Sequence, residues 1–525
     1  MYSKRVIVVG AGIGGLVSAL ELAAQGVEVL VLERAAGPGG KMREVSVGGV
    51  AMDAGPTVFT MRWVFEELFD AVGARLADHL RLRPLDVLAR HAWSNGSRLD
   101  LFADVSRLAD AIGAFAGAQA GRGYLDFCAR ARRIYRTLER PFLRGSRPSP
   151  LSLAGRVGLR GLPDLMRISP FATMWQQLGR HFADPRLQQL FGRYATYCGS
   201  SPFLAPATLM LVAHVEQDGV WLVDGGMHRV AQALAALAQR HGAVVRCGAQ
   251  VETILTRAGR ACGVRLADGE ELAAQAVVFN GDAAALADGL LGAEASRAAT
   301  RVALVRRSLS ALTWNLLAPT SGFPLSRHTV FFSDDSAAEF HDIFGRGRLP
   351  AAPTVYVCAQ DRADNDATSP AGDERLLLIV NAPASGDTRP TTAEELSRCE
   401  AQAFLQMERC GMQVHRIPEH TLITTPQDFD RLFPATGGAL YGQASHGWAA
   451  SFRRPGARSR LPGLYLAGGS VHPGPGVPMA ALSGRQAAAS LLADMAQAHP
   501  LVPASSRPST SPSRPAATPG GTWTR

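Results

Sequence analysis

The chain has 525 residues, too many for one ordinary hydrophobic core, so two or more domains are expected. Hydrophobic residues make up 47% of it and charged residues 19%, a composition that excludes a disordered or fibrous protein. The formal net charge of +9 comes almost wholly from arginine, because lysine occurs only at Lys4 and Lys41, and the total charge alone indicates no partner.

The cysteines and the apolar runs indicate which classes of protein can be excluded. The seven cysteines show no CxxC or Cys/His spacing, so neither a metal site nor a redox disulfide is predicted. No uninterrupted apolar run reaches the ~18 residues of a membrane span, and the first residues lead directly into a strand without a signal peptide. These features predict a cytoplasmic protein that does not cross a membrane.

The N-terminal residues predict a βαβ unit with a dinucleotide-binding turn. Strands at residues 5–9 and 27–32 flank a helix, and a glycine fingerprint lies between the first strand and that helix. Gly10 permits the tight turn, Gly12 lets the backbone approach a pyrophosphate, and Gly15 allows close helix packing. With its strands and helix in place, this fingerprint indicates a bound nucleotide.

The residues after the second strand favour FAD over NAD. Glu33 ends that strand, where a carboxylate binds ribose hydroxyls and repels a 2′-phosphate. Arg34, Gly40 and Lys41 then place backbone amides and cations where they can meet phosphate oxygens, and Gly55 belongs to a run of small residues that suits a flat ring. No second fingerprint follows a strand, so a pyridine-nucleotide-linked disulfide reductase is not expected.

A basic segment follows at residues 130–167. It holds ten arginines against Glu139 and Asp164, interleaved with apolar residues. Such a segment suits the anionic surface of a membrane, and a solvated helical face explains its composition equally well. No nucleic-acid partner is predicted, because the segment lacks stacking aromatics on a recognised module.

Later α/β stretches complete the predicted sheet. A helix at 227–240 is followed by strands at 241–250 and 276–280, and a strand at 463–466 precedes a helix at 479–495. The predicted fold class is therefore α/β, with a discontinuous Rossmann-type FAD-binding domain, an inserted α+β substrate domain and a basic helical membrane-facing segment. The expected boundaries are 1–75, 225–300 and 425–495 for the FAD-binding domain, 76–224 and 301–424 for the substrate and membrane-associating domain, and 496–525 for a disordered Pro/Ser/Thr-rich tail.

The loop at residues 464–479 leads into the last helix. The partial positive charge at a helix N-terminus stabilises negative charge on a flavin that accepts hydride, although an ordinary loop and cap is the alternative interpretation. His472 lies in this loop and is the one candidate that the sequence offers for a catalytic base. A lone histidine is more often structural.

These segments, in this order, resemble the amine-oxidase-like flavoprotein superfamily and, within it, the phytoene-desaturase-type carotenoid desaturases. The resemblance covers nearly the whole chain up to about residue 495. Four stretches resemble more closely the bacterial 1-hydroxycarotenoid 3,4-desaturase (methoxyneurosporene dehydrogenase) branch: 53–69, 190–207, 219–234 and 328–335.

The resemblance implies a set of FAD contacts. Val251 would hold the adenine edge through its backbone, and Gly469 and Met479 would lie by the ribityl chain and the flavin ring. Many flavoproteins bind the ribityl chain with an Asp at the position of Gly469 or Ser470, so the ribityl partner here stays open. The implied FAD-binding residues are Gly10, Gly12, Gly15, Glu33, Arg34, Gly40, Lys41, Gly55, Val251, Gly469 and Met479.

The resemblance also implies an activity. It is introduction of a C-3,4 double bond into an acyclic 1-hydroxy or 1-methoxy carotenoid, by hydride transfer to flavin N5 and loss of a proton from the neighbouring carbon. The implied partners are the acyclic carotenoid, a membrane surface, and oxygen or quinone as electron acceptor. The expected location is cytoplasmic and peripheral on the inner, photosynthetic membrane.

Other functions are compatible with the same motifs. A phytoene desaturase is the nearest alternative. A flavin amine oxidase, a non-catalytic prenyl-binding relative and a carotenoid isomerase that uses reduced flavin are more distant. Oxygen consumption with simple amines would indicate the amine oxidase, and a colourless protein would indicate the prenyl-binding relative.

Overall fold

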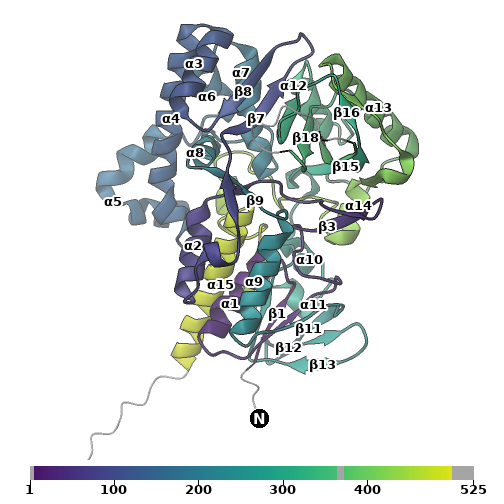
Figure 1. Ribbon diagram of the computed structural model, residues 1–525. Coiled ribbons are helices and arrows are strands. Elements are labelled where there is room, and N and C mark those ends of the chain that lie inside the picture. The colour runs from purple at the N-terminus through teal and green to yellow at the C-terminus, as the bar shows by residue number, and fades with distance from the viewer. Residues whose placement is uncertain (1–4, 363–369, 371, 499–525) are drawn as a thin grey trace, which may run out of the picture.

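The computed structural model describes residues 5–362, 370 and 372–498. One half of the molecule is built on a parallel sheet, and the other half on a larger mixed sheet with a group of helices beside it (Figure 1). This arrangement confirms the predicted mixed α/β fold. The predicted disordered tail lies outside the described residues except for 496–498, which continue the last helix.

The parallel sheet joins strands that are far apart in the sequence. Its strand order is β10-β2-β1-β14-β22, and every neighbouring pair is parallel. All five strands therefore end at the same edge, where the loops that follow them meet. The strands are β1 (Val6–Val9), β2 (Val29–Leu32), β10 (Val244–Arg246), β14 (Ala276–Phe279) and β22 (Leu464–Leu466).

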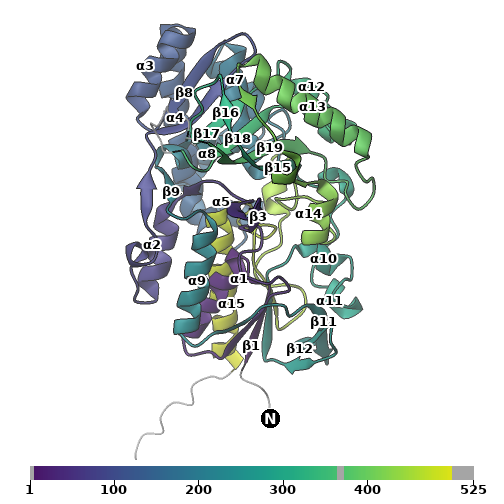
Figure 2. The same cartoon turned by 45° about the vertical axis from the view of Figure 1, so that its right-hand side comes forward.

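Helices cover one face of this sheet and a small antiparallel sheet covers the other (Figures 1 and 2). Val8 packs with the helices and Ile7 with the antiparallel sheet, because alternate residues of a strand face opposite sides. Two helices cross so closely that a Cβ at Gly484 would lie 2.3 Å from the carbonyl oxygen of Gly14. The helices are α1 (Ile13–Ala24), α9 (His228–Arg240) and α15 (Val477–Ala498), and the antiparallel strands are β11 (Val251–Arg257), β12 (Arg260–Leu266) and β13 (Glu271–Ala273).

The mixed sheet has the strand order β21-β15-β19-β18-β17-β7-β8. β17 and β7 pair in parallel and the other neighbours are antiparallel. One face packs residues such as Trp314 and Leu378 against Met407 of α13 (Ala393–Arg409), which leaves the opposite face for the interior of the molecule. The strands are β7 (Val87–Ala92), β8 (Arg98–Phe102), β15 (Ser310–Ala318), β17 (His328–Phe331), β18 (Val355–Ala359), β19 (Glu374–Ala382) and β21 (Thr421–Thr424).

The helices between β8 and β9 (Val220–Val223) pack around an aromatic core that includes Phe127, Phe182 and Phe191. The basic segment forms the end of α4, a π-helical turn and α5, which projects at the edge of the molecule (Figure 1). α5 changes direction at Gly158, where φ is 72°. The helical elements are α3 (Val105–Ala116), α4 (Ala118–Leu138), the π turn (Glu139–Leu143), α5 (Pro150–Arg167), α6 (Met174–His181), α7 (Pro185–Gly192), the 3-10 helices η3 (Arg193–Cys198) and η4 (Ala207–Met210), and α8 (Leu211–Gln217).

Short elements connect the two halves. β9 pairs with β5 and β6, next to α2, and brings the chain back from the helical group to the parallel sheet. Across the described ranges, no helix combines the length and the apolar character that a bilayer crossing requires. The remaining elements are β3 (Glu44–Val47), β4 (Val50–Asp53), β5 (Phe59–Thr60), α2 (Arg62–Ala71), η1 (Leu76–Asp78), β6 (Leu82–Pro84), β9 (Val220–Val223), α10 (Ala283–Ala287), α11 (Ala293–Ser296), η5 (Leu304–Arg306), β16 (Thr320–Ser321), α12 (Ser336–Phe340), the π turn His341–Gly345, β20 (Gln413–Val414), η7 (Pro418–His420), α14 (Pro426–Leu432) and η8 (Ala450–Phe452).

Candidate active site

A cavity of about 1090 Å³ runs through the junction of the two halves. It is lined at one end by the turn after β1 and the residues after β2, and at the other by α5 and the loop at Phe171. The inner face of the mixed sheet and the loop before α15 form the wall between them. The cavity therefore connects the predicted nucleotide site with a chamber at the helical side of the molecule.

The turn between β1 and α1 has the geometry of the glycine fingerprint. Gly10 has a φ of +97°, a conformation that L side chains rarely adopt. A Cβ at Gly12 would lie 2.7 Å from Asn280 Nδ2, and one at Gly15 would lie 2.1 Å from the carbonyl oxygen of Gly10. Gly10 and Gly12 line the cavity, whereas Gly15 packs α1 against the turn.

Glu33 lies buried at the end of β2 and lines the cavity. Its Oε2 accepts a hydrogen bond from Ala11 N at 2.7 Å, and its Oε1 accepts one from Ala35 N at 2.9 Å. These bonds fix the carboxylate to the glycine turn. Its place is that of the ribose-binding acid of dinucleotide folds.

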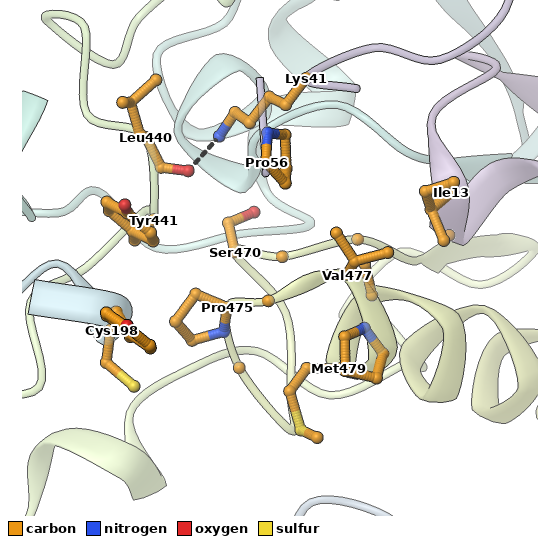
Figure 3. A pocket seen from close by; sticks show the side chains of 18 of the residues that line it. Ile13, Lys41, Pro56, Cys198, Leu440, Tyr441, Ser470, Pro475, Val477 and Met479 are labelled. Atoms are coloured by element: carbon orange, nitrogen blue, oxygen red, sulfur yellow. Dashed lines mark hydrogen bonds between the residues drawn. The ribbon is translucent and has the colours of Figure 1, made fainter. Parts of the chain in front are cut away.

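The loop after β2 folds back over the glycine turn. Gly39 N donates to the carbonyl oxygen of Ala11 at 2.9 Å, and the next residue, Gly40, has a φ of +59°. Lys41 Nζ donates to the carbonyl oxygen of Leu440 at 2.6 Å (Figure 3). Burial lowers the pKa of Lys41. A bound anion would stabilise its charged ammonium form.

Arg34 and Val251 line the cavity beside Glu33. The Arg34 guanidinium donates to the carbonyl oxygens of Arg431 and Leu432. Val251 is the first residue of β11, and the chain just before it is held near β2 because Ala249 N donates to the Glu33 carbonyl oxygen at 2.8 Å.

The segment with Gly55 fits tightly against the basic loop. A Cβ at Gly55 would lie 2.0 Å from the carbonyl oxygen of Lys41. Asp53 in the same segment accepts hydrogen bonds from Met227 N at 2.7 Å and His228 N at 3.2 Å. It thereby joins this segment to the start of α9, which follows the turn at Asp224, Gly225 and Gly226.

Gly469 and Met479 line the cavity at the loop before α15. The side chains of Met479, Pro475 and Tyr441 lie around the same space in Figure 3. Arg454, which the sequence did not single out, is buried behind this loop and donates to the carbonyl oxygens of Tyr441 at 3.0 Å and Gly469 at 3.2 Å. No sequence motif marks such an arginine, because its function is to hold two loops that are distant in the chain.

His472 does not belong to the residues that line the cavity. Its Nε2 lies 2.9 Å from the Phe142 carbonyl oxygen and 3.0 Å from that of Gly145, so this nitrogen carries a proton and donates. Burial lowers the pKa of His472 to about 4. The structure therefore places this residue between the last loop and the π turn after α4, and we do not retain it as a candidate base.

Asp282 is a second polar residue that the sequence did not reveal. It caps α10, because its Oδ1 accepts a hydrogen bond from Ala284 N at 3.0 Å. It lines the cavity close to Ser470, whose Oγ accepts a hydrogen bond from Ala283 N at 3.2 Å. Its Oδ2 is buried and has no partner among the described residues. An unused carboxylate oxygen at this place suits a ligand hydroxyl.

Together these residues fit FAD. The glycine backbone after β1, the acid after β2 and the buried Lys41 match the adenosine and diphosphate parts, and the unpartnered Asp282 oxygen matches a ribityl hydroxyl. The predicted residues that line the cavity are Gly10, Gly12, Glu33, Arg34, Gly40, Lys41, Gly55, Val251, Gly469 and Met479.

A nucleotide turn that opens into an apolar cavity is the arrangement of a flavin-dependent oxidoreductase. The family model described as flavin containing amine oxidoreductase matches residues 13–492. The chain belongs to this family, and the predicted FAD cofactor and oxidoreductase class are confirmed.

Within the family, the chain is similar to curated carotenoid enzymes. It is 59% identical over 496 residues to hydroxyneurosporene desaturase of Rubrivivax gelatinosus, with 94% of each chain covered. It is 45% identical to hydroxyneurosporene desaturase of Cereibacter sphaeroides, with 94% of this chain and 98% of that protein covered. It is 32% identical to 4,4'-diapolycopene oxygenase of Methylomonas sp, with 94% and 99% covered.

Solved structures share the fold at low sequence identity. A triple mutant of putrescine oxidase has a TM-score of 0.58 at 15% identity, covering 94% of this chain and 99% of its own. An oxidoreductase from Methanosarcina mazei has a TM-score of 0.55 at 17% identity, with 93% and 100% covered. These likenesses show the fold alone.

Proposed function

We propose that this protein is an FAD-dependent carotenoid desaturase that introduces a C-3,4 double bond into acyclic 1-hydroxy or 1-methoxy carotenoids. The observation that carries the proposal is the cavity that joins the nucleotide site to α5. A long polyene needs an extended chamber of this kind, whereas a small amine does not. The names of the relatives support the same substrate class.

Bound FAD supplies the acceptor for the hydride that leaves the allylic carbon of the substrate. The residues of this chain would hold it through the glycine turn, Glu33, the basic loop and the start of α15. The partial positive charge at that helix start is oriented toward the loop that lines the cavity. The proposed FAD-binding residues are Gly10, Gly12, Gly15, Glu33, Arg34, Gly40, Lys41, Gly55, Val251, Gly469 and Met479, to which we add Asp282.

The protein's main contribution is alignment of the substrate and exclusion of water. Apolar side chains from the mixed sheet and the helical group line the chamber, so an extended hydrocarbon is held without solvent. Such contacts restrict which carbon pair reaches the flavin. The apolar lining includes Leu88, Leu209, Val212, Val330, Leu377 and Ile379.

The two ends of the cavity, one for FAD and one for the substrate, correspond to two parts of the chain. We propose that residues 1–75, 225–300 and 425–495 form the FAD-binding part, and that 76–224 and 301–424 form the substrate part. Supporting this division, the five strands of the parallel sheet come from the first set and all strands of the seven-stranded sheet come from the second.

We also propose that α5 and the end of α4 rest on the surface of the photosynthetic membrane, on its cytoplasmic side. Leu151, Met166 and Phe171 expose 86%, 64% and 67% of their surfaces there, and Met166 and Phe171 also line the cavity. Next to them, on α4 and the π turn that follows it, exposed arginines have no carboxylate at ion-pair distance among the described residues. An apolar rim beside a cationic patch suits an anionic bilayer from which a polyene enters. The patch arginines are Arg132, Arg133, Arg136 and Arg140.

Product analysis with defined substrates tests the proposal. The purified protein, loaded with FAD and mixed with liposomes, is given an acyclic 1-hydroxy carotenoid and, separately, phytoene, with oxygen or a quinone as acceptor. We expect a product two hydrogens lighter from the 1-hydroxy carotenoid, with the new bond at C-3,4. Activity on phytoene and none on the hydroxylated carotenoid would make the protein a phytoene desaturase instead.

A further inference from the structure

A polar wall interrupts the apolar lining of the chamber. It is built where three distant stretches meet, residues 53–69, 190–207 and 328–335, each of which supports the resemblance to hydroxycarotenoid desaturases. These stretches supply side chains from the segment before β5, from η3 and from β17, and α8 and β18 add Glu216 and Tyr356. The members of the polar wall are Thr57, Arg193, Tyr197, Glu216, His328 and Tyr356, all of which line the cavity.

The Tyr197 hydroxyl joins Arg193 to Glu216 within this wall, and Tyr194 binds Glu216 from behind it. The hydroxyls of Tyr194 and Tyr197 donate to the Glu216 carboxylate at 2.6 and 2.8 Å. Arg193 Nη2 donates to the Tyr197 hydroxyl at 2.9 Å. Both oxygens of Glu216 are therefore occupied, and they lie beyond ion-pair distance of the guanidinium.

Arg193 keeps unused donors. Its Nε is buried without a partner, and its Nη1 makes no hydrogen bond with a residue in the described part of the chain. A guanidinium has only donors, and an unsatisfied charged donor in an apolar chamber is costly. This site therefore favours a ligand that brings an acceptor oxygen.

The other side of the wall is formed by His328, Tyr356 and Thr57. The Tyr356 hydroxyl lies 2.7 Å from His328 Nδ1 and 2.6 Å from Thr57 Oγ1. Burial and the nearby charges of Arg327 and Arg193 lower the pKa of His328 to about 3, so its ring is neutral. Arg193 is therefore the cationic donor of the wall, and these three neutral groups line the same cavity.

The wall lies next to the proposed flavin position. Cys198, at the end of η3, lies beside Tyr441 and Pro475 in Figure 3. Arg193 begins the same 3-10 helix five residues earlier, which is about 10 Å away at about 2.0 Å per residue. Thr57 follows Pro56, which lies beside Lys41 in Figure 3, and both Pro56 and Thr57 line the cavity.

The proposed reaction requires a polar contact at this place. The oxygen on C1 is four bonds from C4, so the two atoms are within about 6 Å at about 1.5 Å per bond. When C4 is held against the flavin, the C1 oxygen therefore also lies near the flavin. A hydroxyl and a methoxy oxygen are both acceptors, so a donor-only group would bind either one.

We propose that Arg193, supported by Tyr197, binds the oxygen on C1 of the substrate and thereby sets both the specificity for oxygenated carotenoids and the position of the new double bond. This inference rests on the proposed function. Arg193 then distinguishes a 1-oxygenated end from a hydrocarbon end, which would leave its donors unsatisfied.

The test compares two substrates in the full-length FAD-loaded enzyme. One is an acyclic 1-hydroxy carotenoid, and the other is its matched 1,2-dihydro hydrocarbon with hydrogen in place of the hydroxyl. Arg193→Met should lower kcat/KM for the hydroxy substrate about 10- to 100-fold and leave the low value for the hydrocarbon nearly unchanged. Arg193→Lys should restore part of the preference, because it returns a charged donor.

Tyr194→Phe is the matched control. It removes a hydrogen bond to Glu216 from the same cluster, but Tyr194 does not line the cavity, so the substrate preference should stay that of the wild type. The double variant Arg193→Met/Glu216→Gln removes both buried charges and decides the question if the single variant does not fold.

An unchanged preference in the folded Arg193 variants, or an equal loss on both substrates, would overturn the inference. In either case wild-type activity on the hydroxy carotenoid would still support the proposed function. Absence of wild-type activity on both carotenoids would instead refute the proposed function, and the inference with it.

Discussion

Asp282 has a carboxylate oxygen without a partner at the place where the flavin's ribityl hydroxyls are expected. Asp282→Ser retains a good helix N-cap and removes that oxygen, so FAD should bind about 10-fold more weakly while the fold is kept. Equilibrium dialysis of FAD measures the effect. Asp288→Ser, at the other end of α10 and away from the cavity, is the control. Equal FAD affinity in the two variants would contradict this role.

His472 illustrates how a residue next to a flavin loop can be structural. Its pKa is lowered from 6.5 to about 4 in the folded protein, so its contribution to stability is complete above about pH 6.5 and is lost as the pH falls toward 4. His472→Gln should unfold more easily at pH 7.5, by about 1–2 kcal/mol, and should lose less stability than the wild type on acidification. The pH profile of turnover should not change.

Thermal unfolding monitored by circular dichroism at several pH values checks the stability part of this prediction. The turnover profile is measured in the same buffers. If the pH profile of turnover has a limb in the wild type that is missing in His472→Gln, His472 takes part in catalysis and the prediction is wrong.

At the scale of elements, α4 and α5 combine a cationic patch with an apolar rim. Neutralising Arg132, Arg136 and Arg140 to Gln should weaken binding to anionic vesicles about 100-fold, since each cation near such a surface contributes about 1 kcal/mol. Vesicle flotation at low and high salt measures binding. Binding of the wild type should fall at high salt.

A control variant with the same change in charge distinguishes local from overall effects. Arg257, Arg297 and Arg301 are exposed and lie on or near β11 and α11, far from α5 in Figure 1. Their replacement by Gln should leave vesicle binding nearly intact. Equal losses in both triple variants would show that net charge, and not the α4–α5 surface, governs the interaction.

Local signals made some elements predictable. The βαβ unit followed from glycine positions and strand patterns within residues 5–33, and α9 from the helical pattern at 227–240. The kink at Gly158 and the pairing of β17 with β7 did not follow, because they depend on partners far away in the chain. The nucleotide end of the site was predictable because its signals are local in the sequence. The polar wall was not, because it is assembled from distant segments.

The polar wall shows this limit most clearly. Arg193 and His328 lie in stretches that the sequence singled out, yet nothing in their spacing indicates that they face one cavity. Arg454 and Asp282 carry no motif at all. Their function comes from burial and from contacts between the C-terminal loop and remote segments.

At the scale of the whole molecule, the account depends on the nucleotide site and the polyene chamber being parts of one cavity. Helices α1 and α15 cross at the Gly14–Gly484 contact, and this packing brings the glycine turn and the last loop to the same end of the chamber. If the two sites form one cavity, the cofactor and the C-3,4 end of the substrate come within reacting distance without a large domain movement.

Anaerobic single-turnover measurement tests this claim most directly. The FAD-loaded enzyme is mixed with a 1-hydroxy carotenoid in liposomes, without oxygen or quinone, and the absorbance of oxidised flavin is followed together with the carotenoid product. We predict loss of one equivalent of oxidised flavin for each C-3,4 double bond formed. Product formed while the flavin stays oxidised, or flavin that stays oxidised with no product at all, would contradict the account.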